Sequence, residues 1–167
     1  MARDFTDHLI DRWTEIRPDL RVASLQVTAR LSRLGRHLAV REEAVFGRYG
    51  LNRGEVGVLA ALRIVEPPHR LSPGRLGRGL MLSSAGVTSR LDRLEHRGLL
   101  RRLPDPLDRR GVIVELTDEG LKMVDAAVGA NTENEEQVLA PLSAAEIETL
   151  EGLLRRILGP LEGPDAG

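Results

Sequence analysis

Residues 72–120 read SPGRLGRGLMLSSAGVTSRLDRLEHRGLLRRLPDPLDRRGVIVELTDEG, and the local signals for secondary structure are densest in this segment. It predicts two helices followed by a β-hairpin, with arginines in the second helix and at the hairpin tip. Ser72 followed by Pro73 is typical of a helix start, because serine caps free amides and proline tolerates the first helical position. We expect this first helix to end near Leu80.

The second helix carries a candidate base-contacting face. Ser83 or Ser84 can cap its start, and Gly98 can end it in the left-handed conformation. Apolar side chains at spacings of four and three residues predict one buried stripe, formed by Val87, Leu91 and Leu94. The other face carries Ser84, Thr88, Ser89 and Arg93. Such side chains can approach base edges and phosphates in a major groove, although a solvated helix face would show the same pattern.

Two strand-like runs, residues 99–103 and 112–116, flank a loop that contains two prolines and a glycine. The pattern predicts a hairpin whose tip holds Arg109 and Arg110. Paired guanidinium groups suit the minor groove, where the negative potential is strong. Asp108 is interpreted as structural, because its carboxylate can pair with an arginine or with loop amides and so hold the tip. The simplest architecture for the whole unit is a helix-turn-helix with an appended β-wing.

The wing segment resembles the signature of the MarR (multiple antibiotic resistance regulator) family of transcription factors. The resemblance rests on residues 108–120, DRRGVIVELTDEG, and residues 89–95, SRLDRLE, are similar to the recognition helix of that family. It extends over about residues 13–158. It implies a mainly α-helical winged helix-turn-helix protein and a homodimer formed by N- and C-terminal helices. Two recognition helices would then meet successive major grooves of a pseudo-palindromic operator in double-stranded DNA.

Composition and charge agree with a DNA-binding protein. The 167 residues are 41% hydrophobic and 2% aromatic, which predicts an aliphatic, largely helical core in one compact domain. The net charge is only −1, but residues 70–110 hold ten arginines against four acids, an excess of six positive charges. Residues 111–167 hold three basic residues against twelve acids. A basic block that coincides with the helix and wing unit favours a surface for phosphates.

Several other classes of protein are disfavoured. The absence of cysteine excludes disulfides, thiolate metal sites and cysteine nucleophiles. The histidines lie on separate expected elements, and no catalytic or nucleotide-binding motif occurs, so neither an enzyme nor a cofactor or metal is expected. The N-terminus has no apolar run typical of a signal peptide or membrane span, which predicts a cytoplasmic protein. A winged helix used only for binding another protein stays open as an alternative.

The flanks predict the organisation of the chain. Residues 1–50 would form an extra N-terminal helix and a long scaffold helix, residues 51–117 the DNA-binding region, and residues 118–167 the C-terminal helices. Two capping boxes are expected, Asn52 with Glu55 and Ser143 with Glu146. The scaffold helix has an apolar stripe of Val27, Leu31, Leu34 and Leu38, and the last helix has one of Ile147, Leu150, Leu153, Leu154, Ile157 and Leu158. An apolar terminal helix can be core or a subunit interface.

Trp13, the only tryptophan, lies on an amphipathic N-terminal segment that resembles the extra helix of the urate-responsive branch of the family. Relatives that respond to aconitate or citrate share this helix. In that branch a tryptophan, an aspartate, a recognition-helix arginine and a wing-base arginine surround an anionic ligand. The resemblance carries these roles to Trp13, Arg90 and Arg102. It thereby implies a repressor that a small anionic or aromatic ligand releases from DNA.

The fourth position of this ligand set does not match, because the aspartate falls on Gly57, which has no carboxylate. Either the ligand differs from urate, or another acid such as Glu55 substitutes, or the ligand response has been lost. Each matching residue also has a structural interpretation. Trp13 can be a core aromatic, and the two arginines can be phosphate contacts or ion-pair partners of Asp92 and Asp105.

Overall fold

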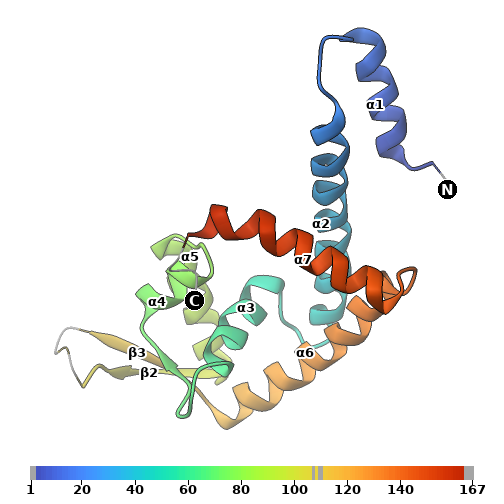
Figure 1. Cartoon of the computed structure of the whole chain (residues 1–167). Helices are drawn as coiled ribbons and strands as arrows, with labels where there is room; N and C mark the ends of the chain where they lie inside the picture. The colour runs from blue at the N-terminus through green and yellow to red at the C-terminus, as the bar shows by residue number, and fades with distance from the viewer. Residues whose placement is uncertain (1–2, 107, 109–110, 164–167) are drawn as a thin grey trace. The chain divides into compact units, whose positions relative to one another are not determined.

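The computed structural model describes residues 3–106, 108 and 111–163. The chain divides into two compact units, Met1–Arg41 and Glu42–Gly167, and each is described by itself. Helices dominate both units, and the one sheet lies in the second (Figure 1). The boundaries of the three regions expected from the sequence, residues 1–50, 51–117 and 118–167, differ from the boundary between these two units. That division into regions stays a prediction.

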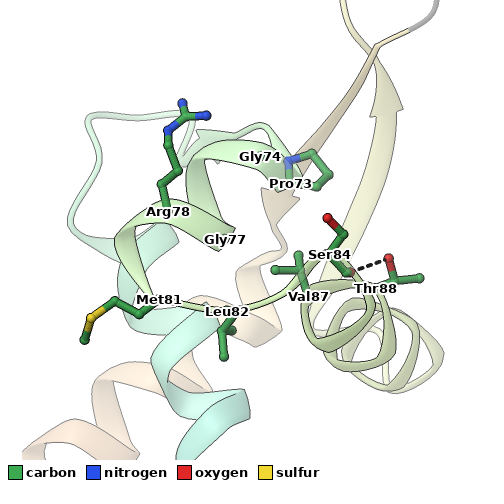
Figure 2. Close-up of a pocket in the computed structure, with 9 residues that line it drawn as sticks. All are labelled: Pro73, Gly74, Gly77, Arg78, Met81, Leu82, Ser84, Val87 and Thr88. Carbon is green, nitrogen blue, oxygen red and sulfur yellow. Dashed lines mark hydrogen bonds between the residues drawn. The ribbon is translucent and has the colours of Figure 1, made fainter.

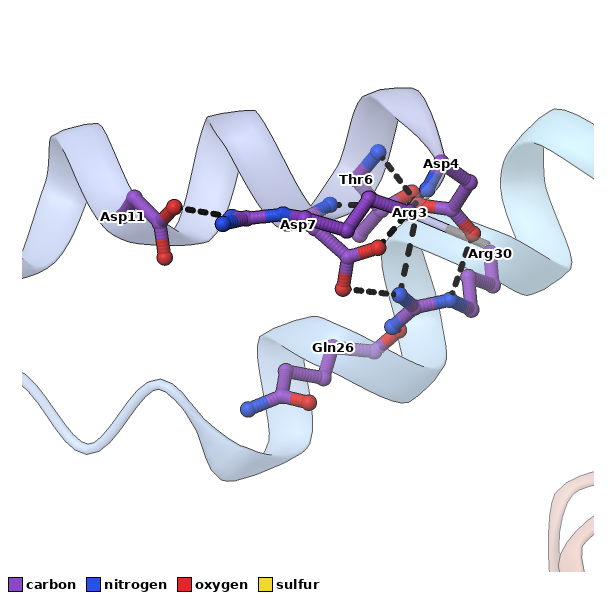
Figure 3. Close-up of polar contacts among 7 residues, drawn as sticks. All are labelled: Arg3, Asp4, Thr6, Asp7, Asp11, Gln26 and Arg30. Atoms are coloured by element: carbon purple, nitrogen blue, oxygen red, sulfur yellow. Dashed lines mark hydrogen bonds and ion pairs between the residues drawn. The ribbon is translucent and has the colours of Figure 1, made fainter. Parts of the chain in front are cut away.

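The first unit consists of α1 (Phe5–Ile16) and most of α2 (Ala23–Gly47), which continues into the second unit. Asp4 caps α1 by accepting hydrogen bonds from the backbone N–H groups of Thr6 and Asp7. Arg30 of α2 donates from Nε to Asp4 Oδ2 at 2.8 Å and from Nη2 to Asp7 Oδ1 at 2.7 Å (Figure 3). These ion pairs fasten α1 to α2, although exposed pairs of this kind contribute little to stability.

The second unit holds the rest of the fold. Its elements in chain order are α3 (Arg53–Arg63), β1 (Arg70–Leu71), α4 (Pro73–Gly79), α5 (Ser84–His96), β2 (Leu100–Pro104), β3 (Val112–Leu116), α6 (Asp118–Leu139) and α7 (Ala144–Glu162). The three strands form an antiparallel sheet in the order β1-β3-β2. The hairpin of β2 and β3 projects beyond the helices as a wing (Figure 1). The architecture is therefore the mainly helical winged helix-turn-helix that the sequence predicts.

The core of the second unit lies where α3, α4 and α5 meet the sheet and α6. Its most deeply buried side chains are aliphatic: Val58, Leu59, Leu62, Leu76, Leu91, Leu94, Leu100, Val114 and Val124. The expected buried stripe of α5 is confirmed, since Val87, Leu91 and Leu94 are each at most 2% exposed. Burial of this stripe against α3 and α4 leaves the opposite face of α5 exposed.

The helix caps confirm most expected boundaries. Ser72 accepts from the backbone N–H of Arg75 at the start of α4. Ser83, and not Ser84, caps α5, because its Oγ accepts from the N–H of Gly86. Gly98 has φ +70° and ends α5 in the left-handed region. The capping boxes expected at Asn52 with Glu55 and at Ser143 with Glu146 are both present.

The strands differ slightly from the expectation. The first strand of the wing begins at Leu100 and ends at Pro104, one residue later than expected, whereas β3 has the expected bounds. The strand β1 was not expected, because two residues are too short to show an alternating pattern. It pairs Arg70 with Glu115 of β3, and so extends the wing hairpin to a three-stranded sheet.

The motif Leu-Thr-Asp-Glu-Gly joins the wing to α6. Thr117 Oγ1 accepts from the N–H of Gly120 at 3.0 Å and donates to the carbonyl of Gly98 at 2.7 Å. A Cβ atom added to Gly120 would lie 1.8 Å from the carbonyl oxygen of Leu99. The first turn of α6 can therefore approach the start of β2 only with glycine at this position.

The long flanking helices carry apolar side chains that their own unit does not bury. Val27, Leu31 and Leu34 of α2 are exposed, and α7 has no buried residue among those described. Exposed apolar side chains of α7 are Ile147, Leu153, Ile157, Leu158 and Leu161. Apolar surface of this extent indicates contact with another molecule. None of the described helices is both long enough and apolar enough to span a bilayer.

Candidate nucleic-acid interface

The exposed face of α5 is polar and made of short side chains. Ser84, Thr88, Ser89 and Arg93, which the sequence predicts to contact DNA, are all exposed. Thr88 Oγ1 donates to the carbonyl of Ser84 at 3.0 Å, so its hydroxyl lies against its own helix (Figure 2). The face is narrow enough to enter a major groove and offers hydroxyl groups for base edges or phosphates.

A groove separates α4 from the first turns of α5 (Figure 2). On the α4 side the lining includes two glycines, Gly74 and Gly77, and on the α5 side it includes Ser84 and Thr88. Because glycines fill so little space, the start of α5 remains accessible from this side. Arg78 also lines the groove and projects from α4.

Arg75 and Arg78 of α4 are cations that the sequence interpretation did not single out. Both are exposed, and neither makes an ion pair within the described residues. Most other described arginines of the basic block are bonded to acids or carbonyl groups of the protein. Arg97, for example, donates to the carbonyls of Gly50 and Tyr49. The sequence signal that could have identified them is the spacing of two arginines one turn apart on the first helix of a helix-turn-helix.

Arg93 forms hydrogen bonds within the protein that its position in the sequence does not indicate. Its Nε donates to Oε1 of Glu55 at 2.8 Å, and its Nη1 donates to Oγ of Ser89 at 2.8 Å. Half of the Arg93 side chain nevertheless remains exposed. The contact of Arg93 with DNA stays a prediction, made by a side chain whose orientation the protein already fixes.

Arg102, on β2, joins the wing to α5. It donates to Asp92 Oδ1 at 2.7 Å and forms a second ion pair with Glu95. Burial by itself lowers the pKa of Arg102. The hydrogen bonds and charges of the two carboxylates together raise it by more, so the pKa lies above its usual value. The structural alternative of an ion pair with Asp92 is therefore confirmed, and Glu95 is a partner that was not expected.

The base of the wing rests on the buried carboxylate of Glu115. Arg101 of β2 donates from Nε to its Oε1 at 2.8 Å, and Arg70 of β1 pairs with its Oε2. Burial by itself raises the pKa of Glu115, but the two guanidinium groups lower it by more, so the pKa lies below its usual range. One carboxylate thus ties all three strands together.

The described part of the wing tip is held by its backbone. The N–H of Asp105 donates to the carbonyl of Gly111 at 3.0 Å, and the N–H of Gly111 donates to the carbonyl of Asp108 at 2.8 Å. A Cβ atom on Gly111 would lie 2.9 Å from that of Asp105. The structural role predicted for the Asp108 carboxylate stays a prediction. Arg109 and Arg110, the predicted minor-groove residues, lie outside the described residues.

Arg90 is packed against the first turn of α3. A Cβ atom on Gly54 would lie 2.3 Å from Nε of Arg90, so glycine makes room for the guanidinium. Nη1 donates to the carbonyl of Gly86 at 3.0 Å, but the buried Nε meets no hydrogen-bond acceptor in the described chain. A buried donor without a partner is uncommon and costs free energy. The Nε of Arg90 is therefore an unpaired donor within the described residues, and it is not accessible to solvent.

The other positions of the expected ligand set, Trp13, Gly57 and Glu55, differ in exposure and in their neighbours. Trp13 lies on α1 and is 40% exposed, so its own unit does not bury it as a core aromatic. A Cβ atom on Gly57 would meet only Leu80, at an ordinary contact distance of 3.7 Å. Glu55 cannot readily supply the missing acid, because Asn52 and Arg93 already occupy its carboxylate. Within the described residues, no cluster of His, Asp and Glu could hold a metal ion.

Two helices joined by a tight turn, with a basic surface and a β-wing, define a winged helix-turn-helix protein of the DNA-binding type. A sequence profile of the MarR family matches residues 49–111. The transcriptional regulator PecS of Dickeya dadantii is 39% identical over 149 residues, which cover 89% of this chain and 90% of PecS. The transcriptional repressor NicR of Pseudomonas putida is 31% identical over 136 residues, or 79% of this chain and 84% of NicR.

A solved structure supports the same assignment. A MarR variant from Escherichia coli in complex with operator DNA has a TM-score of 0.70 and 25% identity, over 88% of this chain and 98% of that one. The chain therefore belongs to the MarR family of DNA-binding transcriptional regulators. The relatives and structures compared are regulators, in agreement with the prediction that the chain is not an enzyme.

Proposed function

We propose that this protein is a homodimeric transcriptional repressor that binds a pseudo-palindromic operator and leaves it when a small anionic or aromatic ligand binds. The observation that carries the DNA-binding part is the exposed polar face of α5 beside two cations of α4 that form no ion pair with any described residue. Ser84, Thr88, Ser89 and Arg93 would contact the major groove. Arg75 and Arg78 would contact the phosphate backbone.

The wing would contact the adjacent minor groove through Arg109 and Arg110. The ion pairs of Arg101 and Arg102 fix the base of the wing relative to β3 and α5. A rigid base lets the tip meet the minor groove in register with α5, where guanidinium groups are attracted by the negative potential. Asp108 would hold the tip in the shape that this contact needs.

Dimerisation is supported by the apolar surface that the flanking helices expose. The exposed fraction is 49% for Leu153 and 47% for Ile157 on α7, and 53% for Val27 on α2. A second copy of the chain would bury these side chains and place two α5 helices on one face of the DNA. A monomer at working concentrations would contradict the proposal.

The ligand-responsive part rests on the resemblance to the urate-responsive branch and on Arg90. Trp13, Arg90 and Arg102 are the proposed effector residues. The Nε of Arg90 has no partner among the described residues, but it is buried, so the side chain would have to move before it donates to an anionic ligand. Arg102 already pairs with Asp92 and Glu95, so a ligand would have to compete with these acids. Since Gly57 supplies no carboxylate, we propose a ligand other than urate. Loss of the response is the second candidate, favoured by the same glycine.

The proposal is tested by a gel-shift titration on the DNA upstream of the gene, with and without small anions. Urate, trans-aconitate, citrate and a panel of aromatic acids are the probes. We expect sequence-dependent binding that one of these anions weakens, since ligand and operator oppose each other thermodynamically. Binding that no anion weakens would overturn the effector part alone. If the protein shows no preference for the upstream DNA, the proposal that it binds an operator there is wrong.

A further inference from the structure

We propose that Glu55 is a positioning residue that sets how strongly this protein discriminates its operator from other DNA, because it holds Arg93 and neutralises its charge. This inference rests on the proposed DNA-binding function of α5. Glu55 lies in the first turn of α3, where a carboxylate also suits the helix N-terminus. Three properties of the pair support this role: where the carboxylate is held, how the guanidinium is oriented, and what charge remains.

The carboxylate of Glu55 is held by α3 itself. It is the third residue of the helix, and its Oε2 accepts from the N–H of Asn52 at 3.1 Å. In return the N–H of Glu55 donates to Oδ1 of Asn52 at 2.9 Å. The residue is 5% exposed. These bonds fix Oε1 at one point beside α5, so the acid cannot follow Arg93 if that side chain turns toward DNA.

The guanidinium of Arg93 is oriented by two bonds. Its Nε donates to Oε1 of Glu55, and its Nη1 donates to Oγ of Ser89, each at 2.8 Å. The side chain is 50% exposed, so part of it remains accessible from outside the protein. Ser89 and Arg93, two of the residues proposed to contact bases, are therefore joined in one arrangement that Glu55 maintains.

Arg93 differs in this respect from its neighbours along α5. Arg90, Arg93 and Arg97 follow one another at helical spacing and all contact residues 49–55 or their own helix. Among the described residues, Arg93 is the member of this set that pairs with an acid. A capping box can also be formed with glutamine, which carries no charge. The charge of Glu55 therefore acts on Arg93 in addition to its effect at the N-terminus of α3.

Pairing changes what Arg93 contributes to DNA binding. A free arginine is attracted to any phosphate, and each phosphate that a protein neutralises steepens the salt dependence of binding by about 0.9. A paired arginine keeps its directed N–H groups but adds little net charge. It can then favour an acceptor placed at the right point while gaining little from phosphates in general. Suppressing affinity for the wrong DNA is one of the two routes to specificity.

The test is Glu55→Gln, which keeps the size of the side chain and the acceptor for Asn52. Affinity for the upstream operator and for an unrelated duplex is measured by fluorescence anisotropy over a range of salt concentrations. We expect the affinity for the unrelated duplex to rise about fivefold, with the salt slope steeper by about one, while operator affinity changes less. The ratio of the two affinities therefore falls. Asp125→Asn removes the same charge from the partner of Arg63 and is the matched control.

The double variant Glu55→Gln with Arg93→Ala separates an effect through Arg93 from one of overall charge. We expect it to bind the unrelated duplex no more tightly than Arg93→Ala alone. An equal rise with and without Arg93 would overturn the proposal, as would an unchanged slope and ratio in Glu55→Gln. If wild-type protein prefers no operator at all, the proposed function fails first. Wild-type preference with no effect of Glu55→Gln overturns only the present inference.

A measurement on the wild-type protein covers the case in which Glu55→Gln does not fold. The Nε–H signal of Arg93 in a nitrogen-15 spectrum, assigned by its loss in Arg93→Lys, should exchange slowly with water. It should stay slow when unrelated DNA is added, because the bond to Glu55 persists. Exchange as fast as that of the exposed Arg78, in either state, would overturn the proposal.

Discussion

Gly120 lies so close to Leu99 that a Cβ atom on the glycine would stand 1.8 Å from the carbonyl oxygen of the leucine. This close approach joins the first turn of α6 to the start of β2. We therefore expect Gly120→Ala to lower the free energy of unfolding by about 3 kcal/mol, because backbone atoms must move apart. Urea denaturation followed by circular dichroism measures the change.

Gly129 of the same helix provides the control for this substitution. No atom lies within 4 Å of a Cβ built on it, apart from its own helix. We expect Gly129→Ala to stabilise the protein by about 0.5 to 1 kcal/mol, as alanine does in an open helical position. Equal effects of the two substitutions would show that the contact with Leu99 does not limit position 120.

Low pH should destabilise the three-stranded sheet, because Glu115 becomes protonated. Because its folded pKa lies below the ordinary value, its stabilisation is present above the unfolded pKa and is lost as the pH falls toward the folded pKa. We expect Glu115→Gln to cost about 1 to 3 kcal/mol at neutral pH, since Arg70 and Arg101 lose their shared acceptor. In acid the wild type should approach the stability of the variant. A difference that does not shrink as the pH falls would contradict this account of the sheet.

Arg75 and Arg78 should act on DNA binding without reading its sequence. Because each is expected to meet a phosphate, replacing either by alanine should reduce the salt slope by about one. Affinity should fall by a similar factor on operator and unrelated DNA. Anisotropy titrations at several salt concentrations measure both quantities. The control is Arg156→Ala on α7, which should leave the slope unchanged. A loss confined to the operator would assign these arginines to bases instead.

The effector response should depend on position 57. A Cβ atom there meets Leu80 only at an ordinary contact distance, so Gly57→Asp can be accommodated. We expect the variant to be released from DNA by urate or a related anion at lower concentration than the wild type. Gel shifts at increasing anion concentration give the comparison, and Gly57→Ala controls for the loss of glycine. No release in either protein would remove the support for an effector site at Trp13, Arg90 and Arg102.

The sequence predicts the helices and strands of this fold well, because the residues that begin and end them act locally. Ser72 with Pro73 and Gly98 each act within a few residues, and the structure confirms both. The strand β1 was missed, since its two residues depend on pairing with β3 and not on a pattern of their own. The expectation that Ser83 or Ser84 starts α5 is resolved in favour of Ser83.

Side-chain partners were harder to predict than elements. The pair of Glu55 and Arg93 joins residues 38 positions apart, and the contact of Arg90 with Gly54 depends on the packing of α5 on α3. No spacing in the sequence indicates either contact. The sequence therefore identifies which arginines belong to the basic surface, but the structure is needed to distinguish those with protein partners from those available to DNA.

Recognition of operator DNA by α4, α5 and the wing is tested by comparing wild-type protein with Arg110→Ala. Affinity for the upstream DNA and for an unrelated duplex is measured at near-physiological salt. We expect a clear wild-type preference for the upstream DNA and a loss of about tenfold in operator affinity in the variant. Unchanged affinity in Arg110→Ala, or a wild type that binds both duplexes equally, would contradict this expectation.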